Sequence, residues 1–195
     1  MSNESQISNN PWNVPNALSF ARLILAFGVG ILIECGFYLA ALVVFVIAAS
    51  TDFIDGWWAR KFNQVTKLGR ILDPFVDKVI ITAALIALVG VAGSGVQAWM
   101  VTIIIGREFL VTSLRAMVEG GGGDFSARWL GKWKMVFQCA AVVASLLWLH
   151  GVSSESWMLW IVIVSVWLAT LITIASGIDY VIQAIKLSRS TEENS

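Results

Sequence analysis

The segment DFIDGWWARKFNQVTKLGRILDPFVDK, residues 52–78, decides how this chain folds. It carries four aspartates and five lysines or arginines, in a chain of 195 residues that is 57% hydrophobic and only 13% charged. Soluble domains have about 25% charged residues, so the composition predicts an integral membrane protein. The four carboxylates then need a compensating charge, because two like charges about 4 Å apart repel by about 4 kcal/mol at an effective dielectric constant of 20.

Apolar stretches flank and enter this segment. A helix that spans a bilayer needs about 20 mostly apolar residues, and six stretches meet this requirement. We therefore predict an all-α integral membrane protein with six transmembrane helices, at residues 17–34, 37–58, 72–93, 96–117, 131–150 and 157–185. We expect one membrane domain, residues 1–195, with tails at 1–14 and 188–195.

The basic residues orient these spans. With six spans, all thirteen lysines and arginines fall in the segments of one side or in the adjoining helix ends, whereas the opposite loops carry only Glu34, His150 and Glu155. The positive-inside rule then places both termini in the cytoplasm. The formal net charge is zero, and we expect no nucleic-acid partner.

The four aspartates lie at the ends of two consecutive spans. Asp52 and Asp55 fall in the last turns of the second span, and Asp73 and Asp77 in the first turns of the third. Their spacings of three and four residues put each pair on one helix face. The short connection makes the two helices neighbours, so the carboxylates can converge at the cytoplasmic boundary. Hard divalent ions such as Mg²⁺, which prefer oxygen ligands, would compensate the charge.

Small and basic residues accompany the aspartates. Gly56, Ala59 and Gly69 leave room for a ligand to approach the backbone, and Arg60 and Arg70 suit an anionic ligand. A purely structural alternative exists for parts of the pattern. The acids could solvate helix ends, and Gly56 with Ala59 could serve helix packing.

The whole pattern resembles the signature of the CDP-alcohol phosphatidyltransferases at every position and every gap. It reads Asp52-x2-Asp55-Gly56-x2-Ala59-Arg60-x8-Gly69-x3-Asp73-x3-Asp77. The resemblance implies an enzyme that transfers a substituted phosphoryl group from a CDP-linked lipid to an alcohol and releases CMP.

The resemblance also implies roles for these residues. Asp77 would be the general base, and two ions of Mg²⁺ or Mn²⁺ would be bound by Asp52, Asp55, Asp73 and Asp77. The CDP-lipid would be bound by Asp52, Gly56, Ala59, Arg60, Gly69 and Arg70.

Four further bases are candidates for binding the phosphate of a phosphorylated acceptor. They are Arg107, Arg115, Lys132 and Lys134. A purely structural role stays open for three of these bases. Lys132 and Lys134 could be ordinary positive-inside residues, and Arg107 could be a structural partner of Glu108.

The stretches PNALSFARL (15–23), REF (107–109) with SLR (113–115), and GKWKMVFQ (131–138) look like the bacterial phosphatidylglycerophosphate synthase branch of the family. That branch uses CDP-diacylglycerol and sn-glycerol 3-phosphate, in the bacterial inner membrane with the active site facing the cytoplasm. Ser19, Met135 and the glycine run 120–123 depart from the branch pattern. A homodimer is consistent with the resemblance.

Alternatives remain inside and outside the family. Within it, the acceptor could be that of a single-site cardiolipin synthase, a phosphatidylserine synthase or a phosphatidylinositol phosphate synthase. Outside it, membrane prenyltransferases use aspartate-rich motifs, and ion carriers use intramembrane carboxylates. Carriers place such charges near the midplane and often have inverted repeats, and neither feature is visible here.

Overall fold

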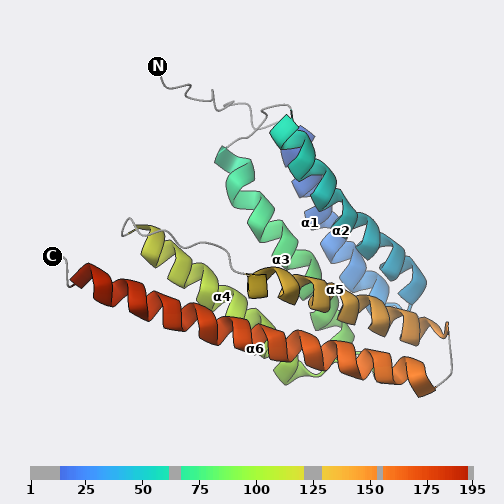
Figure 1. The fold of residues 1–195 in the computed structure, drawn as a ribbon. Helices are drawn as coiled ribbons and strands as arrows, with labels where there is room; N and C mark the ends of the chain where they lie inside the picture. Colours follow the sequence, from blue (N-terminus) through green and yellow to red (C-terminus); the bar gives the residue numbers. More distant parts are fainter. Residues whose placement is uncertain (1–13, 62–66, 121–128, 153–155, 193–195) are drawn as a thin grey trace. The chain divides into compact units, whose positions relative to one another are not determined.

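The computed structural model describes residues 14–61, 67–120, 129–152 and 156–192. Within these ranges the side chains left undescribed are those of 14–16, 52–61, 67–74, 77, 119–120, 129–130, 132 and 188–192. The described segments are helices and short turns without a strand (Figure 1), which confirms the all-α prediction for them. The helices are α1 (Val14–Glu34), α2 (Tyr38–Lys61), α3 (Lys67–Val89), α4 (Ala98–Gly120), α5 (Trp129–His150) and α6 (Ser156–Glu192).

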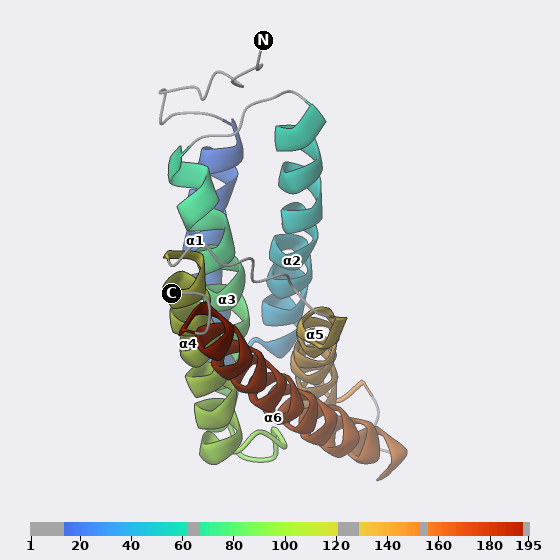
Figure 2. The same ribbon diagram turned by 60° about the vertical axis from the view of Figure 1, so that its left-hand side comes forward.

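The helices form two compact units, Met1–Val91 and Ala92–Ser195. In the first unit α1 packs along both α2 and α3, whereas α2 and α3 touch each other over a shorter stretch. α1 begins, α2 ends and α3 begins at the same end of this unit (Figures 1 and 2). The segments that carry the aspartate pattern therefore lie at one end of a three-helix unit built around α1.

The turn between α1 and α2 has a specific hydrogen-bond pattern. Gly36 adopts a φ of 80°, which glycine reaches without the steric cost of a Cβ atom. Its N–H donates to the carbonyl of Ile33 at 3.0 Å, and the N–H of Phe37 donates to the carbonyl of Leu32 at 2.9 Å. This helix-ending motif satisfies the last carbonyls of α1 and reverses the chain within a few residues.

The buried face of α1 has a helical period. Ala26, Val29 and Ile33 have no exposed surface, and their spacing of three and four residues defines one face of a helix. The same spacing leads back to Arg22 and Ser19, which are buried as well. The core of this unit thus changes from apolar to polar toward the end where the aspartate pattern lies.

In the second unit α6 packs against both α4 and α5. Val111 of α4 and Tyr180 and Ala184 of α6 form a buried apolar cluster. Near the other end of α6, the rings of Trp99 and Trp167 meet edge to face, with their centroids 5.6 Å apart. α6 is therefore the helix that organises this unit.

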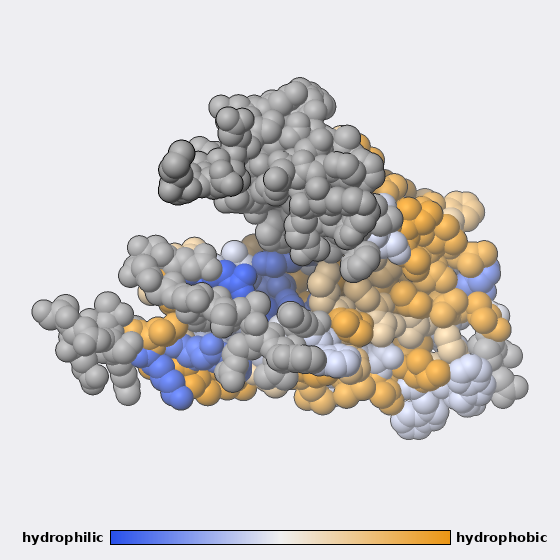
Figure 3. All heavy atoms as spheres, turned by 45° about the horizontal axis from the view of Figure 1, so that its top comes forward, coloured by the Kyte–Doolittle hydropathy of each residue, from blue (hydrophilic) through white to orange (hydrophobic). Residues whose placement is uncertain are grey.

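Apolar side chains cover much of the described outer surface. Ile24, Phe27, Phe109 and Trp160 are each more than 60% exposed, and Figure 3 shows broad apolar areas on the side that it draws. Soluble monomers rarely expose large contiguous apolar patches. The pattern is that of a protein whose outer surface faces lipid.

Three segments are long and apolar enough to cross a bilayer, among the residues that the structure describes. They are Ala17–Glu34, Trp133–His150 and Ser156–Leu187, while Tyr38–Thr51 and Lys78–Val89 are shorter apolar stretches. α4 carries Arg107, Glu108 and Arg115 within its length. Six membrane spans with cytoplasmic termini therefore stay a prediction.

Two helices extend beyond the predicted apolar spans. α3 begins at Lys67 rather than 72, and α6 continues to Glu192 rather than 185. A helix can continue into polar residues beyond its apolar part. Hydropathy therefore identifies the apolar part of a helix but does not show where the helix begins or ends. α3 ends at Val89, before the predicted end at residue 93. There the N–H groups of Gly90 and Val91 donate to carbonyls three residues back, instead of four as in an α-helix, at 3.1 Å each.

We predict that Gly95→Ala destabilises the second unit. Gly95 has a φ of 75°, and an added Cβ would lie 2.6 Å from Cγ1 of Val162, whose side chain is fully buried. Overpacking of this kind costs about 1–3 kcal/mol, measurable as earlier thermal unfolding of the detergent-solubilised protein. Gly106→Ala is the control, because nothing lies within 4 Å of the added Cβ, and it should unfold no earlier than the wild type.

Candidate functional site

Both halves of the aspartate pattern lie in helices. Asp52 and Asp55 belong to the last turns of α2, and Asp73 and Asp77 to the first half of α3. The helical backbone confirms the predicted setting, in which spacings of three and four residues bring side chains to one face. Their side chains lie outside the described residues, so their convergence stays a prediction, as do the roles of Gly56, Ala59, Arg60, Gly69 and Arg70.

The buried row of α2 leads toward these acids. Ala41, Phe45 and Ala48 are buried at four- and three-residue spacing, and in the sequence the same spacing continues to Asp52 and Asp55. α2 packs on α1. The register of α2 therefore connects its core-facing row with the acids of the pattern.

Arg22 of α1 is the largest fully buried side chain in the described part of the chain, with 1% of its surface exposed. Ser19, one turn earlier on the same helix, is also fully buried. An arginine is almost never buried unless it is paired. The core of this unit thus holds a buried arginine and a buried serine toward the end that carries the aspartate pattern.

A second cluster of charges lies in the other unit. The carboxylate of Glu108 on α4 forms an ion pair with the ammonium group of Lys134 on α5, and its Oε1 lies 3.4 Å from Nη1 of Arg107. The three side chains are mostly buried, with 13% of Glu108, 12% of Lys134 and 7% of Arg107 exposed. Glu108 thus serves two bases that come from different helices.

Arg107 is fixed on its other side by α6. Its Nη2 donates a hydrogen bond of 2.5 Å to Oγ of Ser176, and its guanidinium carbon lies 5.1 Å from the ring centroid of Tyr180. A Cβ on Gly177 would lie 3.1 Å from Cγ of Arg107, so the missing side chain there leaves room for the arginine stem. The planar guanidinium can make several such contacts at once.

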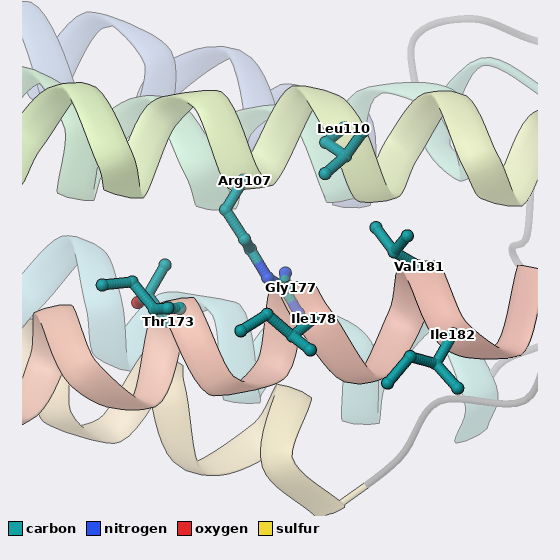
Figure 4. Close-up of a pocket in the computed structure, with 8 residues that line it drawn as sticks. Arg107, Leu110, Thr173, Gly177, Ile178, Val181 and Ile182 are labelled. Atoms are coloured by element: carbon teal, nitrogen blue, oxygen red, sulfur yellow. The ribbon is translucent and has the colours of Figure 1, made fainter.

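An open groove of about 340 Å³ runs along this contact between α4 and α6. Figure 4 shows Arg107 extending from α4 toward Gly177 of α6, with Leu110, Ile178, Val181 and Ile182 around it. The walls are almost entirely apolar. The groove therefore suits hydrocarbon, and the polar contacts of Arg107 lie with Glu108, Ser176 and Tyr180.

Of the four bases predicted to bind the acceptor phosphate, the structure brings two together. Arg107 and Lys134 share Glu108, Arg115 is half-buried further along α4, and the side chain of Lys132 lies outside the described residues. The contact between Arg107 and Glu108 agrees with the structural alternative for Arg107. One carboxylate therefore lies beside two cations, and phosphate binding by these bases stays a prediction.

Comparison with known proteins decides the family. The sequence profile of the CDP-alcohol phosphatidyltransferases matches residues 12–175. A relative from Bacillus subtilis, named CDP-diacylglycerol–glycerol-3-phosphate 3-phosphatidyltransferase, is 38% identical, and the alignment covers 87% of this chain and 93% of the relative. The chain belongs to the CDP-alcohol phosphatidyltransferase family.

Further relatives define the branch of this family. Proteins with the same name from Haemophilus influenzae and Escherichia coli are 34% and 33% identical, over 87% of this chain and over 91% and 93% of theirs. The predicted phosphatidylglycerophosphate synthase branch is thereby confirmed. Membership also excludes the prenyltransferase and ion-carrier interpretations.

The sequence interpretation missed the α6 contacts of this phosphatidyltransferase. Ser176 and Tyr180 lie beyond the range that the family profile matches. A signal was nevertheless present, since Thr170, Thr173 and Ser176 recur every three residues in a mostly apolar stretch, with Tyr180 one turn on. Thr173 accepts a 3.2 Å hydrogen bond from Nε2 of Gln138 on α5, so this polar row faces the neighbouring helices.

We predict that Ser176→Ala lowers the unfolding free energy by about 1–3 kcal/mol, because it removes a buried acceptor from a charged donor. Thermal unfolding in detergent measures the change. Ser145→Ala is the matched control, since Ser145 is also fully buried but its Oγ has no hydrogen-bond partner among the described residues. Equal destabilisation by both variants would mean that the Arg107 contact contributes nothing measurable.

Proposed function

We propose that this protein transfers the phosphatidyl group of CDP-diacylglycerol to sn-glycerol 3-phosphate. The acceptor hydroxyl forms a bond to phosphorus, the bond between that phosphorus and the CMP oxygen breaks, and the products are phosphatidylglycerophosphate and CMP. The observation that carries the proposal is the complete eight-residue aspartate signature in a chain whose relatives bear the name of this reaction.

Members of this family depend on divalent metal ions, and the donor set of the aspartate pattern suits them. Four carboxylates offer oxygen ligands only, which Mg²⁺ and Mn²⁺ prefer. We propose that Asp52, Asp55, Asp73 and Asp77 hold two such ions. When bound, the ions would bind the diphosphate oxygens and offset the charge that develops on the departing CMP.

The remaining residues of the pattern bind and activate the substrates in this proposal. Asp77 takes the proton of the acceptor hydroxyl as general base. Gly56, Ala59 and Gly69 leave space for the cytidine, and Arg60 contacts the nucleotide phosphates. Asp52 and Arg70 complete the set that binds the CDP-lipid.

The acceptor phosphate is bound by the bases of the second unit, namely Arg107, Arg115, Lys132 and Lys134. Support comes from the trio formed by Arg107, Glu108 and Lys134, in which one carboxylate holds cations from two helices close together. A phosphate monoester carries a charge of about −1.5 to −2 at pH 7. It would be attracted by both cations, whereas a neutral alcohol would not.

We further propose the setting in which this reaction occurs. Residues 1–195 act as one domain with six spans in the bacterial inner membrane, and both termini and the active site face the cytoplasm. The distribution of lysines and arginines supports this orientation. A homodimer fits the proposal, which does not depend on one.

The purified protein in mixed micelles with CDP-diacylglycerol and Mg²⁺ should release CMP on addition of sn-glycerol 3-phosphate. We expect at least a hundredfold lower rate with serine, because a site that pairs buried charges with its substrate discriminates strongly against an acceptor that leaves them unpaired. Inositol phosphate and phosphatidylglycerol carry a phosphate of their own, so they test the shape of the acceptor site rather than its charge, and we expect glycerol 3-phosphate to be the faster substrate. Release with another acceptor and none with glycerol 3-phosphate would establish one of the other family activities instead.

Asp77→Asn should abolish turnover, with a loss of about 10²–10⁴-fold, because an amide cannot accept the hydroxyl proton. Binding of the CDP-lipid should remain, since Asp52, Asp55 and Asp73 keep their carboxylates. CMP release measures the first effect and equilibrium binding of CDP-diacylglycerol the second. A wild-type rate in this variant would remove the general-base assignment.

A further inference from the structure

Glu108 lies between two bases that we assign to the acceptor site. We propose that Glu108 is a positioning residue for this site, and that its carboxylate holds the Lys134 ammonium group and the Arg107 guanidinium group in place before the acceptor arrives. The inference rests on the proposed function, because it takes the phosphorylated acceptor as the ligand of these bases.

Both bases are held from more than one helix. Arg107 of α4 contacts α6 through Ser176 at 2.5 Å and the ring of Tyr180. Lys134 of α5 has a flexible stem that loses side-chain entropy when it is ordered, and its ammonium group forms an ion pair with Glu108 of α4. Glu108 is therefore the carboxylate that connects the two bases.

Burial makes the carboxylate necessary at this point. The side chains of Glu108 and Lys134 are 13% and 12% exposed, so water screens their charges weakly. Without the carboxylate, two mostly buried cations would repel each other, and the flexible lysine would move away from Arg107. With it, the two cations stay together, where they can face an anionic ligand jointly.

A positioning role affects one substrate selectively. A side chain that is ordered in advance lowers the entropic cost of binding the ligand that it contacts. Loss of Glu108 should therefore raise the KM for glycerol 3-phosphate and leave the KM for CDP-diacylglycerol unchanged. A residue that only stabilised the helices would alter the active fraction of the enzyme and lower kcat, without separating the two KM values.

The test uses the full-length Glu108→Gln variant, assayed by CMP release in mixed micelles with both substrates varied in turn. We expect the KM for glycerol 3-phosphate to rise about tenfold, the size expected when one long side chain must be ordered on binding. Asp179→Asn is the control. It also removes one carboxylate from the second unit, but that carboxylate accepts a hydrogen bond of 3.1 Å from Gln183 of its own helix.

A double-mutant cycle identifies the residue through which Glu108 acts. In the background of Lys134→Gln, the change Glu108→Gln should raise the acceptor KM by about threefold or less, because contacting residues are not additive. A full tenfold increase in that background would show that Glu108 does not act through Lys134.

The outcomes separate this inference from the proposed function. A wild type that releases no CMP with glycerol 3-phosphate overturns both. The role of Glu108 alone is overturned if the wild type is active but Glu108→Gln leaves the acceptor KM unchanged or lowers it, or raises both KM values equally.

If Glu108→Gln does not fold, Glu108→Asp replaces it, since its shorter side chain keeps the charge but draws it back from Lys134. The acceptor KM alone should then rise by about threefold, and the same contrary results apply.

Discussion

Charge compensation inside apolar helices is the constraint on which both units depend. Water cannot screen an ionisable group that is buried among hydrophobic side chains, so each such group needs a partner nearby. In the second unit the chain supplies partners itself, through Glu108, Ser176 and Tyr180 around Arg107, and through the same Glu108 beside Lys134. In the aspartate pattern four like charges recur on two helices, and divalent ions are the natural external partners.

The need to compensate Arg107 also explains how the second unit is built. α6 packs on both α4 and α5, and the polar contacts cross the same helix surfaces. Arg107 reaches α6 where Gly177 leaves space, and Gln138 of α5 donates to Thr173 of α6. Apolar contacts alone do not determine which surfaces of two apolar helices pack together, and hydrogen bonds between the helices add that specificity. A misaligned α6 would leave these groups unpaired, so the polar row also sets its register.

Much of the fold could be predicted because its signals are local. Six apolar stretches separated by glycine- and serine-rich turns correspond to six helices, and Gly36 adopts the positive φ that its turn requires. The helix ends were harder to place, since Lys67 begins α3 within a polar stretch that hydropathy excludes. The aspartate pattern could also be recognised from the sequence, because all its residues lie in one continuous segment that covers the end of one helix and the start of the next.

The partners of Arg107 could not be predicted in the same way. Ser176 lies 69 residues further along the chain, and serine is common in membrane helices for many reasons. Only the packing of α4 on α6 pairs that serine with the arginine. Lys134 shows the same difficulty, since it stands at a helix start where a positive charge is expected for topology alone. Its ion pair with Glu108 requires that α4 and α5 both lie on α6.

The two clusters suit opposite kinds of ligand. The aspartate pattern supplies carboxylates, which suit cations, whereas Arg107 and Lys134 place two cations beside one carboxylate and suit an anion. In the proposed reaction a metal-bound diphosphate would meet the first requirement and a phosphorylated alcohol the second, and a neutral acceptor would leave the second unmet. The preference for a phosphorylated acceptor would then follow from the bases of the second unit, while the chemistry would follow from the acids of the first. Because separate residues set the two properties, the acceptor can differ within the family while the aspartate pattern stays the same.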